Sequence, residues 1–331
     1  NKIMKKSIIK KIFIKLCKIM GYEIIDQNNF VSPTLNRELN DNLSILNDKS
    51  IVLPLGEVKI SRKITSVLII FRTNSNIEIW DQNKKRLFEE PKIEYTIRSL
   101  KSLIKSINFC NEKYPSIKIK LMIVDDNSKQ ENLEKITTLA KNSNLKTEIL
   151  NLDHHKYKNV IKEQKNEQTF SNLASLLCCY ENAKEHGEDL VFFVEDDYLH
   201  FVPMMEEMIS SYERISSQLN KDIFICPSDY PFLYMNNKKT NVLIGNKRHW
   251  RTIDETLCTF MTSKKFIEKY WENFRKTCLD RNEPFEKYLN EIYKSEICIS
   301  PMKSLSVHFT NINSSYGLSP FIDYKKLWDE N

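Results

Sequence analysis

Apolar residues follow two alternating patterns between residues 65 and 217. Continuous apolar runs rich in β-branched residues predict buried strands over 65–72, 117–124, 145–150 and 190–194. Apolar residues at helical spacing predict helices over 94–109, 131–141, 170–187 and 202–217. Strands that alternate with helices indicate βαβ units, so we expect an α/β fold in which a mostly parallel sheet carries helices on both faces.

The pattern is different outside this region. Residues 1–20 place apolar side chains on one arc of a helical wheel and lysines on the other, which predicts a basic amphipathic helix. Residues 21–60 are rich in Asn and Asp and predict an irregular lead-in. Beyond residue 220 the pattern is mixed, with short strands, a helix over 264–276 and a loop-rich end.

The net charge of +6 is concentrated in one part of the chain. Fifty basic residues oppose 44 acidic ones, and residues 1–20 contain seven lysines and no acidic residue. The remainder is nearly neutral, which argues against a nucleic-acid-binding protein because such proteins carry their excess charge on a folded face. We expect the basic helix to lie in an anionic membrane interface; the alternative is a helix packed on the body with its lysines in solvent.

Glycine and cysteine usage narrow the class of protein further. Five scattered glycines exclude both a dinucleotide-binding fingerprint and a P-loop, so a bound phosphate has to be held in another way. Eight cysteines include no C-x-x-C pair and several lie in apolar runs, which predicts buried reduced thiols and a cytoplasmic location. Because no long charge-free apolar run occurs, we expect a peripheral protein on the inner face of the membrane.

Polar clusters follow three of the predicted strands, where ligands bind in open parallel sheets. They are Thr73 and Asn74, Asp125 and Asp126, and Glu195, Asp196 and Asp197. Three successive carboxylates require neutralisation, and a divalent cation that bridges to a phosphate-bearing substrate supplies it. The alternative is a solvated acidic turn in which Asp197 caps a following helix.

The order of these motifs resembles the nucleotide-sugar half of GT-A-fold glycosyltransferases, especially the bacterial family 2 type. It consists of a first strand leading into Thr73-Asn74, then VDDNS, then a helix with Ser171-Asn172, then FVEDDY. The resemblance implies that residues 61–200 bind the nucleotide sugar and that residues 201–331 form the acceptor half of the same domain.

The resemblance also implies roles for individual residues. Glu195 stands where the family usually has Asp. Either Asp125 or Asp126 is expected to contact the nucleoside, and Asp197 to be the main ligand of Mn²⁺ or Mg²⁺. The implied nucleotide-binding set is Thr73, Asn74, Asp125, Asp126, Asn172 and Asp196, and the implied metal-binding set is Glu195, Asp197 and His308.

A reaction that inverts the anomeric centre needs a general base, because the attacking hydroxyl loses its proton. In the family this base is an Asp or Glu well downstream of the metal motif. Asp254 or Glu255 is favoured here by its position in the chain, and Asp229 is the second choice because it lies beside two prolines in a turn-like segment.

Further candidates lie in the second half and in a polar stretch. Trp250 and Arg251 are expected to contact the sugar and a phosphate, the alternative being a core tryptophan beside a surface arginine. His308 is the histidine expected at the metal, the alternative being a structural residue. Residues 153–168, which include His154 and His155, are expected to form a loop or a lid over the nucleotide.

These observations favour a metal-dependent glycosyltransferase. It would move a sugar from a nucleotide-diphosphate sugar, most simply a UDP-sugar, to a surface glycan or a lipid-linked acceptor. One alternative is a sugar-phosphate nucleotidyltransferase, but RTNSN after the first strand contains no glycine, whereas those enzymes carry a glycine-rich loop there. Another is a catalytically silent protein that binds nucleotides or glycans.

Overall fold

The structure is a computed structural model of the 331-residue chain. It describes residues 2–22, 24, 44–47, 49–52, 56–76, 86–162, 166–235, 237–310 and 313–331.

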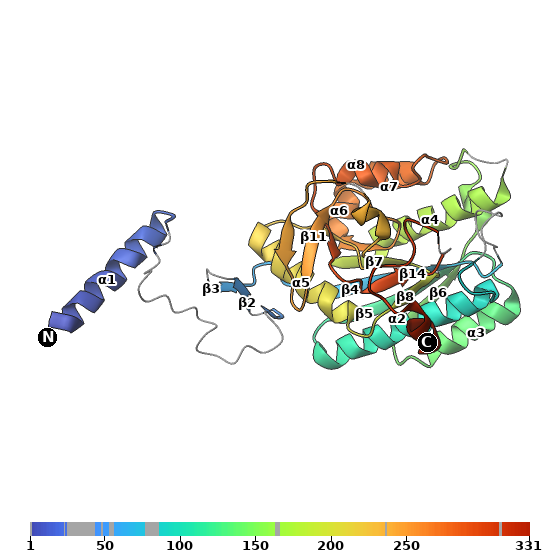
Figure 1. Ribbon diagram of the computed structural model, residues 1–331. Helices are drawn as coiled ribbons and strands as arrows, with labels where there is room; N and C mark the ends of the chain where they lie inside the picture. Colours follow the sequence, from blue (N-terminus) through green and yellow to red (C-terminus); the bar gives the residue numbers. More distant parts are fainter. Residues whose placement is uncertain are drawn as a thin grey trace.

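A nine-stranded mixed sheet forms the centre of the fold (Figure 1). Strands β7, β4, β5 and β6 are parallel neighbours in that order, and β12 joins the far side of β7 in the antiparallel sense. From one edge to the other the strands are β10 (Val242–Ile244), β11 (His249–Ile253), β13 (Cys298–Pro301), β9 (Phe224–Ile225), β12 (Phe260–Ser263), β7 (Leu190–Glu195), β4 (Ser66–Thr73), β5 (Lys118–Asp125) and β6 (Lys146–Asn151).

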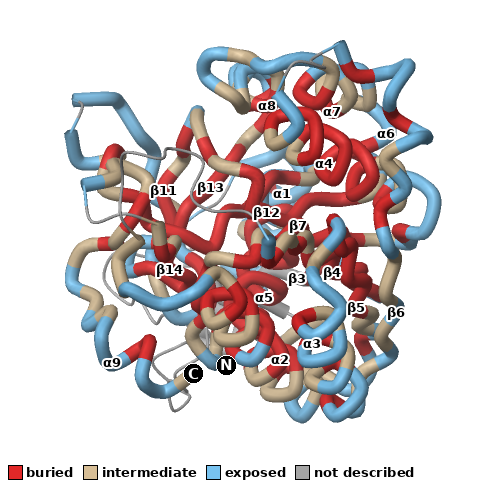
Figure 2. Tube along the Cα trace, turned by 90° about the vertical axis from the view of Figure 1, so that its right-hand side faces the viewer, coloured by how far each residue is buried: buried red, intermediate tan, exposed pale blue. Residues whose placement is uncertain are grey.

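Helices cover both faces of this sheet because alternate strand residues point in opposite directions. Leu68 and Ile70 of β4 belong to a core with α4 (Glu167–His186), α6 (Lys264–Lys269), α7 (Trp271–Thr277) and α8 (Lys287–Ile292). Val67 and Ile69 belong to a second core with α2 (Lys92–Lys113), α3 (Gln130–Lys141) and α5 (Met204–Leu219). Figure 2 shows the strands between these layers as buried.

A third, smaller core lies beside α2. It joins the short antiparallel pair β8 (Tyr198–His200) and β14 (Ser306–His308) to α9 (Tyr324–Asp329). Its aromatic centre is Trp328, whose ring lies 4.6 Å from that of Tyr95 of α2. This packing holds β14 beside the end of β7, which brings the last part of the chain to the carboxyl ends of the central strands.

The α/β architecture predicted from the sequence is confirmed, and the four predicted strands match β4, β5, β6 and β7 to within a residue or two. The helix predicted over 264–276 is divided at Tyr270 into α6 and α7. Strands from both predicted halves, 61–200 and 201–331, belong to the one large sheet.

The expectation of an irregular lead-in over residues 21–60 is wrong for part of it. An antiparallel three-stranded sheet is formed by β1 (Ser44–Ile45), β2 (Lys49–Val52) and β3 (Gly56–Lys59), while residues 23, 25–43, 48 and 53–55 lie outside the described chain. Asn47 has φ of 61°, a left-handed conformation that Asn adopts more readily than most residues, at the turn between β1 and β2. Strands of two to four residues are too short to produce a periodic pattern.

The remaining expectations concern residues 1–20 and the cysteines. Lys2–Ile19 form helix α1, as predicted. Among the described residues, no helix has the length and apolar character needed to cross a bilayer. All eight cysteines are buried and unpaired, as the absence of C-x-x-C spacing predicted.

Candidate active site

A cavity of about 510 Å³ opens at the carboxyl ends of β4 and β7. Its walls also include the first turns of α2 and α4, the segment before α8 and the segment after β14. It is lined by Arg72, Thr73, Asn74, Arg86, Lys92, Asp126, Gln168, Asn172, Ser175, Glu195, Asp196, Asp197, Leu257, Arg281, Asn282, Glu283, Phe285, Glu286, His308, Phe309, Thr310, Ser314 and Tyr316.

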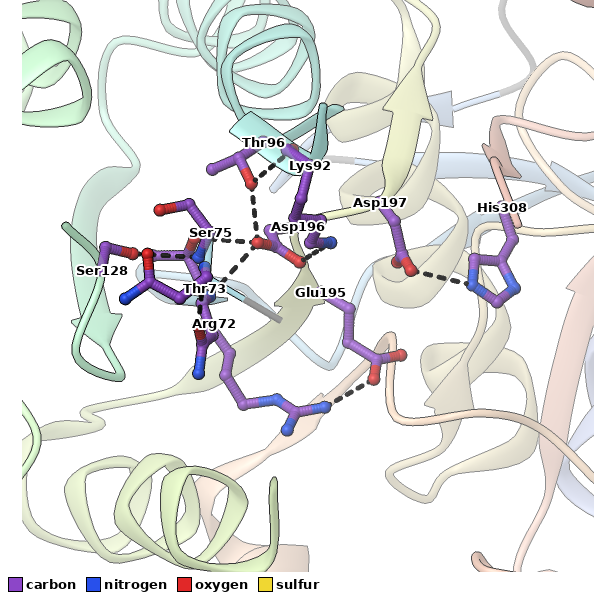
Figure 3. Close-up of polar contacts among 12 residues, drawn as sticks. Arg72, Thr73, Ser75, Lys92, Thr96, Ser128, Glu195, Asp196, Asp197 and His308 are labelled. Atoms are coloured by element: carbon purple, nitrogen blue, oxygen red, sulfur yellow. Dashed lines mark hydrogen bonds and ion pairs between the residues drawn. The ribbon is translucent and has the colours of Figure 1, made fainter. Parts of the chain in front are cut away.

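The three carboxylates at the end of β7 point to different partners (Figure 3). Glu195 forms an ion pair with Arg72, whose Nη2 lies 2.6 Å from Glu195 Oε1. Asp196 points to the opposite side, as neighbours on an extended chain do, and meets α2. Asp197 faces His308. The three charges are therefore separated, and only Asp197 has a partner from the last part of the chain.

Asp196 holds the rim of the cavity together. It accepts hydrogen bonds from Thr73 Oγ1 and Thr96 Oγ1, each at 2.8 Å, and from the backbone N–H of Asn74 at 3.3 Å, and it is paired with Lys92. Because these donors already occupy its lone pairs, we interpret this carboxylate as an anchor of β4 and α2. Asp196, which was predicted to bind the nucleotide, therefore lines the cavity, but its oxygens are already bound by other residues of the protein.

Asp197 and His308 form the pair best suited to a divalent cation. His308 Nδ1 lies 2.9 Å from the carbonyl oxygen of Tyr316, which can only accept, so Nδ1 carries the proton and Nε2 faces Asp197 Oδ2 at 3.3 Å. Asp197 Oδ1 is buried and has no hydrogen-bond partner among the described residues. An imidazole nitrogen and an unpaired carboxylate oxygen at one place fit a metal ion that shares its coordination with phosphate oxygens.

Neighbouring charges favour the ionised forms of both residues, so a metal ion at His308 Nε2 would have to displace a proton from that nitrogen. Burial alone would raise the pKa of Asp197, but the nearby His308 and Lys92 outweigh it and hold that pKa well below its usual range. Burial opposes the charged form of His308, and the Asp197 carboxylate more than compensates, so the His308 pKa is raised. Within the part of the chain that the structure describes, no three His, Cys, Asp or Glu side chains are grouped as a metal site. A bound metal would therefore need ligands from the substrate.

Glu195 has other partners than this pair. Besides Arg72, it contacts Thr259, whose Oγ1 accepts the Glu195 backbone N–H at 3.1 Å. Arg72 in turn holds the side chain of Asn172 at the cavity wall. The predicted residues Glu195 and Asn172 are thus joined through Arg72, which the sequence analysis had noted only as the end of a strand.

The two aspartates at the end of β5 have separate environments. Asp125 lies below the cavity surface, where its carboxylate accepts the Ser128 backbone N–H at 3.1 Å, and burial raises its pKa. Asp126 lines the cavity and is held by His154 Nε2 at 2.6 Å and by the Ser171 hydroxyl. Of the two alternatives for a nucleoside contact, only Asp126 lines the cavity, although it is buried and both of its oxygens have protein partners.

His154 belongs to a short 3-10 helix, η2 (His154–Tyr157), and its ring meets Phe170 edge-on at 5.6 Å. The prediction for this stretch is a loop or a lid over the nucleotide, and it does not include the contact with Asp126. Residues 163–165 of the predicted lid lie outside the described chain, so the lid stays a prediction.

The structure does not bring the predicted bases Asp254 and Asp229 to the cavity. Asp254 is exposed and paired with Lys238 at 2.9 Å, and Asp229 is buried against Arg251. Glu255 reaches the cavity only indirectly, by accepting a hydrogen bond from the hydroxyl of Tyr316.

The predicted sugar contacts are also placed elsewhere. Trp250 is fully buried in the core between β11 and α5, because the alternation along β11 turns it inward. Arg251 lies on the opposite side of β11, and Asp229 accepts its hydrogen bond while the Tyr234 ring lies 4.3 Å away. Neither residue lines the main cavity, so the core alternative considered for Trp250 is the one observed.

Glu286 is a cavity residue that the sequence analysis missed. The residue is partly exposed, and burial of its carboxyl group together with the nearby Glu195 raises its pKa to about 8. It directly precedes α8, in a polar segment that carries no periodic pattern and no recognisable motif. Only its position beside Glu195 in the folded chain distinguishes it from the other glutamates.

Comparison with known proteins gives only distant structural likeness. No protein-family model matches this chain, and no curated protein matches it. Among solved structures, the galactosyltransferase LgtC with donor and acceptor sugar analogs is 10% identical with a TM-score of 0.38, over 70% of this chain and 72% of that one. The 1-349 portion of S. aureus TarS is 13% identical with a TM-score of 0.41, over 73% of this chain and 59% of that one.

A third solved structure belongs to another class of enzyme. UDP-glucose pyrophosphorylase complexed with UDP-glucose is 9% identical with a TM-score of 0.38, over 76% of this chain and 95% of that one. Likenesses this distant carry no argument about the function of this chain.

Proposed function

We propose that this protein is a metal-dependent glycosyltransferase, which moves a sugar from a nucleotide-diphosphate sugar, most simply a UDP-sugar, to a surface glycan or a lipid-linked acceptor. The observation that carries the proposal is the pair Asp197 and His308. A carboxylate oxygen with no hydrogen-bond partner in the described part of the chain and an imidazole nitrogen lie at one cavity, at the carboxyl ends of parallel strands. Such a place is where open α/β sheets bind nucleotides.

The cavity offers suitable contacts for a nucleotide diphosphate. Asp126 and Asn172 supply polar atoms on the side of β5 and α4, where a nucleoside would lie. Lys92, Arg86 and Arg281 bring positive charge to the same cavity. Asp197 and His308 would hold Mn²⁺ or Mg²⁺, which when bound would stabilise the negative charge of the departing diphosphate.

We assign the general base to Glu286. Transfer breaks the bond between the sugar C1 and the diphosphate oxygen, forms a bond from the acceptor oxygen to C1, and passes the acceptor proton to the Glu286 carboxylate. A carboxyl group with a pKa of about 8 holds that proton far better than an ordinary one, because an effective base has a pKa near the working pH. Attack from the side opposite to the leaving diphosphate would invert C1.

UDP binding with and without metal tests the proposal. Calorimetry should show UDP affinity that depends on Mn²⁺, and Asp197→Asn should weaken it at least about 10-fold. Asp254→Asn is the matched control, because Asp254 is an exposed acid outside the cavity, and it should bind as the wild type does. UDP binding that survives both EDTA and Asp197→Asn unchanged would contradict the metal site.

Turnover separates an enzyme from a silent binding protein. UDP release should be measured with a panel of nucleotide sugars and with glycan and lipid-linked acceptors. If UDP binds with metal but no nucleotide sugar is ever consumed, the protein is a binding protein and the enzymatic part of the proposal fails.

We further propose that α1 attaches the protein to the inner face of a membrane. Most of its apolar side chains that the structure describes are more than half exposed, for example Phe13 at 57% and Ile9 at 67%. Lys10, Lys11 and Lys15 accompany them on the same helix, which suits an anionic lipid surface.

Sedimentation with vesicles of an anionic phospholipid tests this attachment. The wild-type chain should sediment with the vesicles, and Ile9→Glu with Phe13→Glu should remain in the supernatant. Ile244→Glu replaces an exposed apolar residue of β10 and serves as the control. Equal sedimentation of wild type and the α1 variant would overturn the attachment.

A further inference from the structure

A second cavity of about 350 Å³ lies toward the β10 edge of the large sheet, beside β11 and the segment before β13. Its walls combine aromatic rings, such as those of Phe232 and Tyr293, with hydroxyl and amide groups, such as those of Thr252 and Asn241. Aromatic surface with a few polar groups is the composition of sites that bind small molecules or sugar units.

Two buried polar groups on its wall have unused hydrogen-bonding capacity. Tyr293 is 6% exposed, and its hydroxyl has no partner among the described residues. Arg251 is 8% exposed, and within the same part of the chain its Nε has no partner although the guanidinium is paired with Asp229. Buried polar groups normally find partners, so these two keep unused hydrogen-bonding capacity beside the cavity.

Only a thin layer of side chains separates this cavity from the candidate active site. The ring of Phe232, which lines the second cavity, lies 4.8 Å from that of Tyr316, which lines the main one. The chain between Asp254 and Leu257 likewise borders the second cavity at one end and the main cavity at the other. The two cavities are therefore neighbours, and a ligand that occupied both would have to pass over this layer.

The second cavity has a surplus of positive charge. Lys238 neutralises Asp254 at 2.9 Å, and Glu296 is paired with both Lys221 at 3.0 Å and Lys269 at 2.8 Å. Burial opposes ionisation of Glu296, but these lysines outweigh it and lower its pKa to about 2, so the pairs stay formed. With the acids of the lining already paired, the exposed rim lysines Lys239 and Lys294 add positive charge.

We propose that this cavity is a second acceptor subsite that binds a negatively charged sugar unit of a glycan whose end lies in the active site. The acceptor class is thus a glycan bearing carboxylates or phosphates. This inference rests on the proposed glycosyl transfer. Lys239 and Lys294 would bind the anionic groups, and the Tyr293 hydroxyl would bind the sugar hydroxyls or ring oxygen.

Binding of matched oligosaccharides tests the subsite. The probes are a fluorescently labelled hyaluronan hexasaccharide, which carries carboxylates, and labelled maltohexaose, which is neutral and of the same length. The full chain should bind the anionic probe more tightly by fluorescence anisotropy. Lys239→Ala with Lys294→Ala should weaken that binding about 5- to 30-fold, because exposed charge contacts contribute little singly and two are removed.

Controls separate this subsite from the active site. Lys265→Ala removes an exposed lysine of α6 that lines neither cavity, and it should leave probe binding unchanged. UDP affinity should be the same in the wild type and the double variant. Equal affinity for the two probes, an unchanged affinity in the double variant, or a parallel loss of UDP affinity would each overturn the subsite. A different result would overturn the glycosyltransferase proposal instead. In that case the wild type would bind the anionic probe through the two lysines but would not bind UDP at all.

Discussion

Replacing Glu286 with glutamine is expected to make the protein more stable and less active. In an unfolded chain the carboxyl group has a pKa near 4.5, whereas in the folded protein burial and Glu195 raise it to about 8. Between these two values the folded state holds a proton that the unfolded state has lost. The free energy of unfolding of the wild type therefore falls as the pH rises from about 4.5 to 8.

The size of the effect follows from this difference in pKa. At pH 7 the solution is about 2.5 pH units above the unfolded pKa of the carboxyl group. At 1.36 kcal/mol per unit, the free energy of unfolding of the wild type is lower there by up to about 3 kcal/mol. Solvent reaching the partly exposed residue reduces this figure. Glutamine does not ionise, so Glu286→Gln should raise the free energy of unfolding by this amount at pH 7. At pH 4 it should change that free energy very little. For a chain of 331 residues, 3 kcal/mol corresponds to roughly 4 °C in Tm.

Two assays check this reasoning. Thermal unfolding at pH 4, 7 and 8 should show a gain in Tm for Glu286→Gln that grows with pH, and kcat should fall about 10²- to 10⁴-fold. In the wild type, kcat should rise with pH and level off above about 8 as Glu286 loses its proton.

Glu283→Gln is the matched control, because Glu283 lines the same cavity but is exposed and lies 3.5 Å from Arg281. It should change stability by no more than about 0.5 kcal/mol at any pH. A gain in Tm for Glu286→Gln that is the same at pH 4 and pH 8 would refute the electrostatic explanation. An unchanged kcat would refute the role of Glu286 as base.

Three further predictions concern residues in the site and residues that the structure places outside it. Arg72→Met should destabilise the fold by about 3–5 kcal/mol in urea unfolding, because Glu195 loses its partner, and adding Glu195→Met should restore most of that loss. Failure of the second change to restore stability would contradict the pairing. Trp250→Ala should cost about 3–5 kcal/mol in the same assay but leave the acceptor KM of the folded protein unchanged, since the ring is core. Asp254→Asn should leave kcat/KM within about twofold of the wild type, because this acid is exposed; a large drop would return the role of base to Asp254.

The central strands were predictable because they are buried on both faces. In β4, seven of the eight positions are buried, and the five successive residues from Val67 to Phe71 are all apolar, a pattern that is visible without knowing any partner. The acidic ends of β5 and β7 were visible for the same reason, since each follows directly on such a run. The small sheet formed by β1, β2 and β3 escaped notice because its strands are too short for any periodicity.

The sequence alone thus determined the α/β class, the order of the main strands and helices, and the edge of the sheet at which the polar clusters would meet. These are local properties, set by which residues can be buried on a strand or a helix face. The partners within the cavity were decided by the tertiary structure. Glu286 and His308 line the same cavity as the end of β7, although they are 89 or more residues away along the chain. A local sequence pattern cannot predict such a contact. Trp250 is buried and Asp254, which follows β11, is exposed. Which side of β11 faces the core depends on the elements packed against this strand, and the strand's own sequence does not show them.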